Sequence, residues 1–193
     1  MRKLGIVEFV SLDGVMQSFG GPDEDREGGF EHGGWGAPYF DDVMARSAGS
    51  SLRPSTVYLL GRKTYQAMAA HWPHQPPEDM MATHLNRAEK YVATRTLETL
   101  EWSNAHVLEG EIVPAVNKLK AAGDGYVVVL GSGALIDSLN REGLVDEYRL
   151  FVHPLLLGAG KRLFRDLPQP RPLRLLECTP TGTGVLMLNY EVV

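Results

Sequence analysis

The sequence contains a single cysteine, Cys178, among its 193 residues. An internal disulfide is therefore excluded, and so is a zinc site built from several thiolates. No apolar run approaches the roughly 18 residues that a membrane-spanning helix needs, so we expect no membrane partner. The first residues, 1–8, are interrupted by Glu8 and lack a small-residue cleavage site. They indicate a strand and not a signal peptide.

An excess of basic residues is also missing. The chain has 19 Lys and Arg against 24 Asp and Glu, which gives a formal net charge of −5. A general nucleic-acid binder would show a basic balance, so no nucleic-acid partner is expected. The content of 44% hydrophobic and 22% charged residues is ordinary for a globular chain. The length predicts one domain, residues 1–193, and we expect it to be cytoplasmic.

Motifs for nucleophilic catalysis are absent as well. The sequence has no Gly-x-Ser-x-Gly elbow and no convincing Cys/His pair. His71, His74 and His84 lie in or near a proline-rich segment, and their spacing matches no zinc motif. We interpret these three histidines as loop residues.

Two segments share the pattern of an apolar run, a glycine and a predicted helix. The runs are 57–60 and 127–130, followed by Gly61 and Gly131. Continuous aliphatic runs of this length are typical of strands buried on both faces, as in parallel sheets. Helices are predicted over 64–70 and 134–140, and a third, over the stripe Ile112, Val113, Val116 and Leu119, ends near Gly123.

The rest of the chain predicts further strands over 90–93, 105–108, 147–152, 173–178 and 185–193. The last three have only turn signals between them. The predicted fold class is therefore α/β, a mixed and mostly parallel sheet flanked by helices, with antiparallel C-terminal strands.

The segment from Ser18 to Ala37 is rich in glycine and acidic residues and has no periodicity. A long irregular segment in a compact domain is either a functional lid or a disordered stretch. We favour a lid, because Phe30, Trp35 and Tyr39 supply apolar anchors at its far end.

The first candidate site is Gly61-Arg62-Lys63-Thr64. A helix that starts directly after a parallel strand offers free N–H groups and a positive dipole end, and the two cations add charge for a phosphate. The alternative is an ordinary helix start with two solvated cations.

The second candidate is Leu130-Gly131-Ser132-Gly133-Ala134. The Rossmann fingerprint would need Gly or Ala where Ile136 stands, so a Rossmann-type dehydrogenase is disfavoured. Two adjacent helix starts would still hold a pyrophosphate between them. The alternative is that these glycines only form the turn after the strand and bind no ligand.

Three further positions are weaker candidates. Thr94-Arg95 follows a predicted strand, where Arg95 is either a ligand for a ribose 2′-phosphate, favouring NADPH, or a plain surface residue. Asp13 is either a substrate anchor or a turn residue, with Gly14 supplying a positive φ. A helix is expected to begin at Pro38 and to bury Tyr39, Phe40, Val43 and Met44. Within it, Asp41, next to Asp42, is either a proton donor or an acid that stabilises the helix start.

Taken in order, these motifs resemble the dihydrofolate reductase-like superfamily, and above all the reductase domain of the bifunctional riboflavin-biosynthesis deaminase-reductase. The resemblance rests on Ser11-Leu12-Asp13-Gly14, Gly61-Arg62-Lys63-Thr64-Tyr65, Ala93-Thr94-Arg95, Gly131-Ser132-Gly133-Ala134-Leu135, Asp146 to Leu150 and His153 to Gly160. It covers nearly the whole chain.

The resemblance implies an NADPH cofactor and a small heterocyclic substrate of pterin or pyrimidine type. The cofactor-binding residues it implies are Val10, Ser11, Gly61, Arg62, Lys63, Thr64, Thr94, Arg95, Leu130, Gly131, Ser132, Gly133, Ala134 and Leu135. It also implies a homodimer formed through the C-terminal strands. The zinc site of the deaminase half cannot be built with Cys178 alone, so that activity is not expected.

The resemblance thus predicts an NADPH-dependent reductase that transfers a hydride, with Asp13 or Asp41 serving the substrate. A nucleotide-binding module that keeps the fold without turnover is the alternative.

Overall fold

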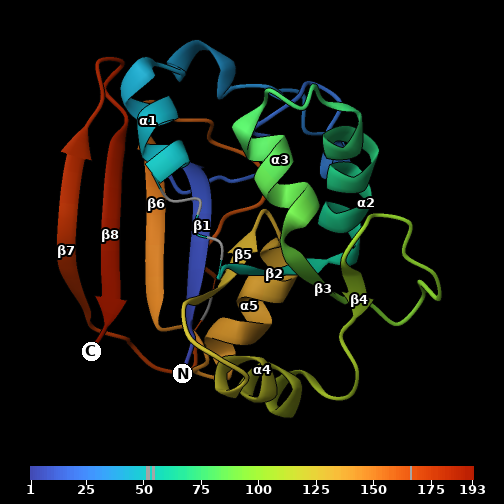
Figure 1. The fold of residues 1–193 in the computed structure, drawn as a ribbon. Coiled ribbons are helices and arrows are strands. Elements are labelled where there is room, and N and C mark those ends of the chain that lie inside the picture. The colour runs from blue at the N-terminus through green and yellow to red at the C-terminus, as the bar shows by residue number, and fades with distance from the viewer. Residues whose placement is uncertain (51–52, 54, 166) are drawn as a thin grey trace.

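The computed structural model describes residues 1–50, 53, 55–165 and 167–193. In this part of the chain the strands form a single sheet with the order β4-β3-β2-β5-β1-β6-β8-β7 (Figure 1). The strands are β1 Lys3–Ser11, β2 Val57–Gly61, β3 Glu89–Ala93, β4 Ala105–Val107, β5 Tyr126–Leu130, β6 Glu147–His153, β7 Leu173–Pro180 and β8 Leu186–Val192.

The sheet is mixed and mostly parallel. Strands β4, β3, β2, β5, β1 and β6 run parallel, whereas β8 is antiparallel to β6 and β7 is antiparallel to β8. The predicted fold class is confirmed. A Rossmann fold, with the strand order 3-2-1-4-5-6, is ruled out because β1 here lies between β5 and β6.

Helices cover both faces of this sheet (Figure 1). On one face Val116 and Leu139 pack against Ile6, and on the other Leu85 packs against Leu60. Met44 packs on the second face against the β1–β6 half. The α-helices are α1 Asp42–Ser50, α2 Arg62–His71, α3 Met80–Arg87, α4 Ile112–Ala121 and α5 Gly133–Arg141, with 3-10 turns η1 Glu27–Gly29, η2 Ala37–Tyr39 and η3 Trp72–His74.

Burial follows the predicted pattern in β2 and only in part in β5. Every residue of β2 from Val57 to Leu60 is buried, whereas in β5 Val127 and Val129 are buried and Val128 and Leu130 are half-buried. The central strands therefore form the core, and their carboxyl ends meet at one edge. No helix in the described ranges is long and apolar enough to cross a membrane.

The interpretation of the three histidines as loop residues was wrong. His71 ends α2, His74 lies in η3 and His84 lies in α3. Pro76 and Pro77 lie before α3 and do not interrupt it. The helix begins after Asp79, whose carboxylate caps it by accepting the Ala82 N–H at 3.0 Å.

The expected helix at Pro38 was also misplaced. Pro38 lies in η2, and the α-helix begins only at Asp42. Met44 is buried as predicted, but Phe40 is extended and 58% exposed. The Asp41 carboxylate accepts the Met44 N–H at 2.9 Å, and this cap fixes the later start.

Candidate functional site

The carboxyl ends of β3, β2, β5, β1 and β6 lie side by side at one edge of the sheet. The predicted site residues, Asp41 excepted, all belong to these strand ends or to the residues directly after them. In open α/β sheets this edge is where ligands bind. The edge is therefore the candidate functional site.

A buried serine joins the two glycine motifs. The Ser132 Oγ accepts the Gly61 N–H at 2.9 Å and lies 3.0 Å from the Thr64 Oγ1. The Thr64 hydroxyl donates in turn to the Gly131 carbonyl oxygen at 3.0 Å. The structure thus brings the two motifs, more than sixty residues apart in sequence, into one hydrogen-bonded unit.

The two helix starts beside this unit carry no side-chain cap at their first position. Neither Gly61, at the start of α2, nor Ser132, at the start of α5, caps its helix with a side-chain hydrogen bond. The backbone N–H groups in the first turns of α2 and α5 therefore receive no side-chain cap from these residues, and both helix starts carry the positive end of the helix dipole. This arrangement fits the phosphates of a dinucleotide.

The glycine at position 131 has a positive φ of +57°. A Cβ built there would contact the Thr64 Cγ2 at 3.4 Å, and the backbone conformation disfavours a side chain. The residue is exposed at the site edge. A bare backbone that a ligand can approach closely is the feature a pyrophosphate cradle needs.

Three cations flank the helix start of α2 and the end of β3. The Arg62 guanidinium donates to the Thr96 Oγ1 at 3.0 Å, and Lys63 pairs with Glu27 at 2.9 Å. Arg95 is exposed, and the Thr94 hydroxyl accepts two backbone N–H groups of the following turn. The positive charge expected from the sequence is therefore present at this end of the edge.

Val10, Ser11 and Leu135 are buried at the edge. Ser11 pairs in register with His153 of β6, and its Oγ accepts the Val15 N–H. Leu130 and Gly133 are half-buried, while Ala134 is exposed at the start of α5.

Asp13 lies in the turn after β1. Hydrogen bonds from the Ser11 hydroxyl and from the Leu157 and Gly158 N–H groups lower the pKa of Asp13 to about 2. Its main-chain carbonyl accepts the Arg162 guanidinium at 2.9 Å. The ionised carboxylate therefore ties the β1 turn to the segment that follows β6.

Asp41 lies before α1 and away from the glycine motifs. Its Oδ1 caps the helix, and its Oδ2 accepts the Gly182 N–H at 2.7 Å. These backbone donors, the Met44 N–H foremost, hold the pKa of Asp41 below its ordinary value. The carboxylate thus joins α1 to the turn between β7 and β8.

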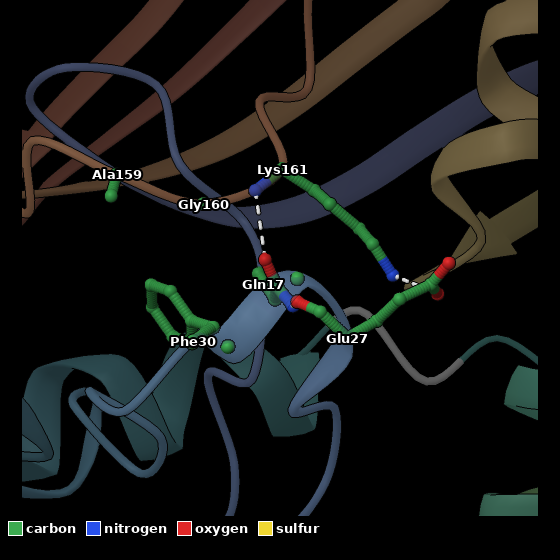
Figure 2. A pocket seen from close by; sticks show the side chains of 8 residues that line it. Gln17, Glu27, Phe30, Ala159, Gly160 and Lys161 are labelled. Atoms are coloured by element: carbon green, nitrogen blue, oxygen red, sulfur yellow. Dashed lines mark hydrogen bonds and ion pairs between the residues drawn. The ribbon is translucent and has the colours of Figure 1, made fainter.

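The glycine-rich segment folds over the edge and is held by ion pairs. Lys161 contacts Asp25 at 2.5 Å and Glu27 at 2.7 Å. The Glu27 carboxylate accepts from both Lys161 and Lys63, and these two contacts lower the pKa of Glu27 to about 2. Figure 2 shows the Lys161 side chain pointing to Glu27 and the Lys161 backbone N–H donating to the Gln17 side-chain oxygen. These residues line a pocket of about 400 Å³. Glu27 therefore bridges the segment to Lys63 of α2.

Two buried polar groups escaped the sequence reasoning. Glu8 of β1 is 4% exposed, and its Oε1 has no hydrogen-bond partner among the described residues. Burial raises the pKa of Glu8 to about 8, although the N–H groups of Gly131 and Phe9 act against this. The interruption of an apolar run by one acidic residue was the signal that could have identified it.

The second group is His153, at the end of β6. It is fully buried, and its Nε2 has no hydrogen-bond partner in the described ranges. Burial lowers the pKa of this imidazole. The motif at residues 153–160 includes this histidine, but the sequence does not show its burial, because its surroundings come from three separate segments of the chain.

The strand order, with its mostly parallel strands and antiparallel C-terminal pair, is that of the dihydrofolate reductase-like fold. The family model of the RibD C-terminal domain matches residues 2–187. The chain belongs to this family, and the resemblance drawn from its motifs is confirmed.

Solved structures support the fold over nearly the whole length. A candidate riboflavin-biosynthesis protein from Shewanella sp. PV-4 is 17% identical with a TM-score of 0.69, and the match covers 99% of each chain. A pyrimidine reductase-like protein from Corynebacterium diphtheriae is 12% identical with a TM-score of 0.63, covering 100% of this chain and 92% of the other.

Dihydrofolate reductase from Enterococcus faecalis, solved with NADP(H), is 12% identical with a TM-score of 0.59, covering 98% and 94% of the two chains. Among curated proteins, the uncharacterized YyaP of Bacillus subtilis (strain 168) is 31% identical over 136 residues, 69% of this chain and 72% of YyaP.

Proposed function

We propose that the protein is an NADPH-dependent reductase acting on a small heterocycle of pterin or pyrimidine type in the cytoplasm. When bound, NADPH supplies the hydride, which goes to a C=N or C=O carbon. The observation that supports this most is the unit formed by Gly61, Thr64, Gly131 and Ser132 between two uncapped helix starts. Membership of the RibD C-terminal domain family adds to it.

Each residue at the edge has a role in this proposal. Gly61, Arg62, Lys63 and Thr64 bind phosphate oxygens at the start of α2, where charge and backbone N–H groups act together. Thr94 and Arg95 bind the adenosine 2′-phosphate. The remaining positions, Val10, Ser11, Leu130, Gly131, Ser132, Gly133, Ala134 and Leu135, line the path of the pyrophosphate and the nicotinamide.

Asp13 or Asp41 anchors the substrate in this proposal. Each ionised carboxylate already accepts backbone N–H groups, so each is fixed in position for a further donor. The folded segment from Ser18 to Ala37 excludes water from the edge when it is closed.

The same two carboxylates favour a second candidate function. Both are bound by backbone donors of neighbouring turns, which is a structural role that needs no substrate. A nucleotide-binding module without turnover is consistent with this. The two candidates differ in one result: the module binds NADPH, but no heterocycle of the pterin or pyrimidine type oxidises it.

The first experiment is a paired titration of the protein with NADPH and NADH, followed by tryptophan fluorescence or calorimetry. We expect saturation with NADPH and much weaker binding of NADH, because the 2′-phosphate adds a charge that Arg95 contacts. Absence of binding by either cofactor would overturn the proposal.

Variants then test the individual residues. Arg62→Ala should weaken NADPH binding roughly tenfold or more, since a charge-assisted hydrogen bond contributes about 1.5–3 kcal/mol. Asp13→Ala should weaken it less, and Arg141→Ala, which removes a cation paired with Asp137 on α5, serves as the charge-matched control. Gly131→Val should block the cofactor; unchanged binding in the folded variant would remove this glycine from the site.

A further inference from the structure

The imidazole of His153 presents one free hydrogen-bond acceptor inside the protein. Its Nδ1 lies 2.9 Å from the Phe151 carbonyl oxygen and 3.2 Å from that of Val10. Carbonyl oxygens only accept, so Nδ1 carries the proton and Nε2 is an unprotonated acceptor. Burial, which lowers the pKa of His153, favours the same neutral form. The described residues offer this buried Nε2 no donor.

Aromatic rings surround this imidazole. The ring centroids of Phe9, Phe19, Trp35 and Tyr39 lie 6.2, 5.3, 5.1 and 5.4 Å from that of His153. The indole N–H of Trp35 donates to the Gln17 carbonyl oxygen and is therefore not directed at His153. A buried acceptor in such surroundings calls for a partner that brings both a flat apolar face and a donor.

The ring of Phe19 lies flat where such a partner would stack. It is 4.1 Å from the ring of Phe9 at an interplanar angle of 14°, and Phe9 stacks in turn on Phe151 at 4.6 Å. Phe9 and Phe151 belong to the sheet, whereas Phe19 belongs to the glycine-rich segment. The outermost ring of the stack can therefore leave without any change in the sheet.

Gly36 makes room for this ring. A Cβ built on Gly36 would lie 2.0 Å from a ring carbon of Phe19, so any larger residue there would displace the phenyl group. The backbone of Gly36 has an ordinary helical conformation, with φ −75° and ψ −27°, so the glycine is needed for space and not for its backbone.

We propose that the slot between Phe9 and the Phe19 backbone binds the planar ring of the substrate, and that the His153 Nε2 accepts a hydrogen bond from an N–H group of that ring. Phe19 occupies the slot in this structure and swings out when the substrate enters. His153 is thus a specificity-determining residue that selects heterocycles with a ring N–H. This inference rests on the proposed reductase function, for which it defines the substrate class.

The test uses two planar probes, lumazine and 1,3-dimethyllumazine. They share the pteridine ring system, but only lumazine has ring N–H donors. Binding is measured by calorimetry and by quenching of tryptophan fluorescence, since Trp35 lines the slot. The wild-type protein should bind lumazine about tenfold more tightly than the dimethyl compound, the discrimination expected of one hydrogen bond to a buried acceptor.

Two variants open the slot and leave the His153 side chain itself unchanged. Phe19→Ala and Gly36→Ala should both increase the affinity for lumazine. The Phe19→Ala slot also has room for the added methyl groups, so a preference for lumazine that persists there reports on the N–H donor and not on size.

Two variants of His153 separate its nitrogens. His153→Asn keeps a donor close to the position of Nδ1 and removes the acceptor, so it should bind both probes equally. His153→Gln places an amide oxygen near the position of Nε2 and should restore part of the preference. Lumazine should also shift the Nε2 resonance of His153 in ¹⁵N NMR of the wild-type protein, which a purely structural histidine would not show.

Equal binding of the two probes by both the wild-type and the Phe19→Ala protein, or an unshifted Nε2 resonance at saturating lumazine, would overturn the proposal. NADPH titration of the same samples separates the causes. If the wild-type protein binds NADPH but binds the two probes equally, only the role of His153 is refuted. If the wild-type protein does not bind NADPH, the reductase function is refuted.

Discussion

Glu27 and Lys63 lie 36 residues apart in sequence, and their charged atoms are 2.9 Å apart in the structure. The acidic residue belongs to the glycine-rich segment, and the lysine belongs to the first turn of α2. In the proposed function Lys63 binds a phosphate. Glu27 therefore competes with the cofactor for the same cation.

Glu27→Gln should bind NADPH several-fold more tightly than the wild-type protein, because the phosphate then has no carboxylate to displace. Both partners of the pair are largely exposed, so the effect should shrink as salt is added. Glu31→Gln, an exposed acid of the same segment, is the matched control and should leave NADPH binding unchanged. Equal affinities for the two variants would contradict the competition.

Ser132→Ala should destabilise the fold and weaken NADPH binding together. The substitution removes the oxygen that accepts the Gly61 N–H and the hydroxyl that donates to Thr64. The half-buried Gly61 N–H then has no acceptor in Ser132, and a lost hydrogen bond of this kind costs about 1 kcal/mol. Ser138→Ala removes an exposed hydroxyl of α5 that, among the described residues, bonds to the Ala134 carbonyl alone, so it should cost much less. Urea denaturation and NADPH titration of both variants provide the comparison.

Glu8 should make the stability of the protein fall as the pH rises. Its pKa is about 8 in the folded protein and 4.5 in the unfolded chain, so between these values the unfolded chain is ionised while the folded protein retains the proton. Unfolding then releases a proton, and the free energy of unfolding decreases by at most about 1.4 kcal/mol per pH unit.

Glu8→Gln has no such proton to lose. The difference in stability between this variant and the wild-type protein should therefore change in favour of the variant from pH 5 to pH 8. Denaturation in urea at several pH values measures this difference. A difference that stays constant over this range would show that Glu8 is ionised in the fold.

The outer strand β7 supports the prediction of a homodimer, which we retain as a proposal. Leu175 and Leu176 are about half exposed on this edge strand, which has β8 as its neighbour on one side only. An exposed apolar edge strand is a template for pairing with a second copy. Leu175→Glu should therefore yield a monomer in light scattering, while Leu156→Glu, exposed in the segment after β6, should not.

Much of the fold could be predicted because the signals are local. The aliphatic runs at 57–60 and 127–130 are strands, and the glycines after them start helices, since burial on both faces needs such runs and a helix start favours such residues. Helix α3 and the start of α1 were missed. Both starts depend on a single capping aspartate, Asp79 or Asp41, whose hydrogen bond is visible only in the folded chain.

The candidate site could be predicted in part for the same reason. Gly61, Arg62 and Gly131 follow predicted strands, and parallel strands bring their carboxyl ends to one edge. The roles of Ser132, Glu27 and His153 could not be predicted in this way. Each depends on partners from distant segments, and a sequence pattern records neighbours along the chain only.

Short stretches of sequence were enough to predict the class of fold, the position of the glycine motifs and the family, because periodicity, turn residues and motif order are local properties. The folded chain was needed to see that Ser132 joins the two motifs, that Glu27 reaches Lys63, and that aromatic rings from β1 and the glycine-rich segment enclose His153. These contacts depend on sheet order and on the path of an irregular segment. Both are set by long-range packing, where burial and hydrogen bonding are satisfied by the chain as a whole.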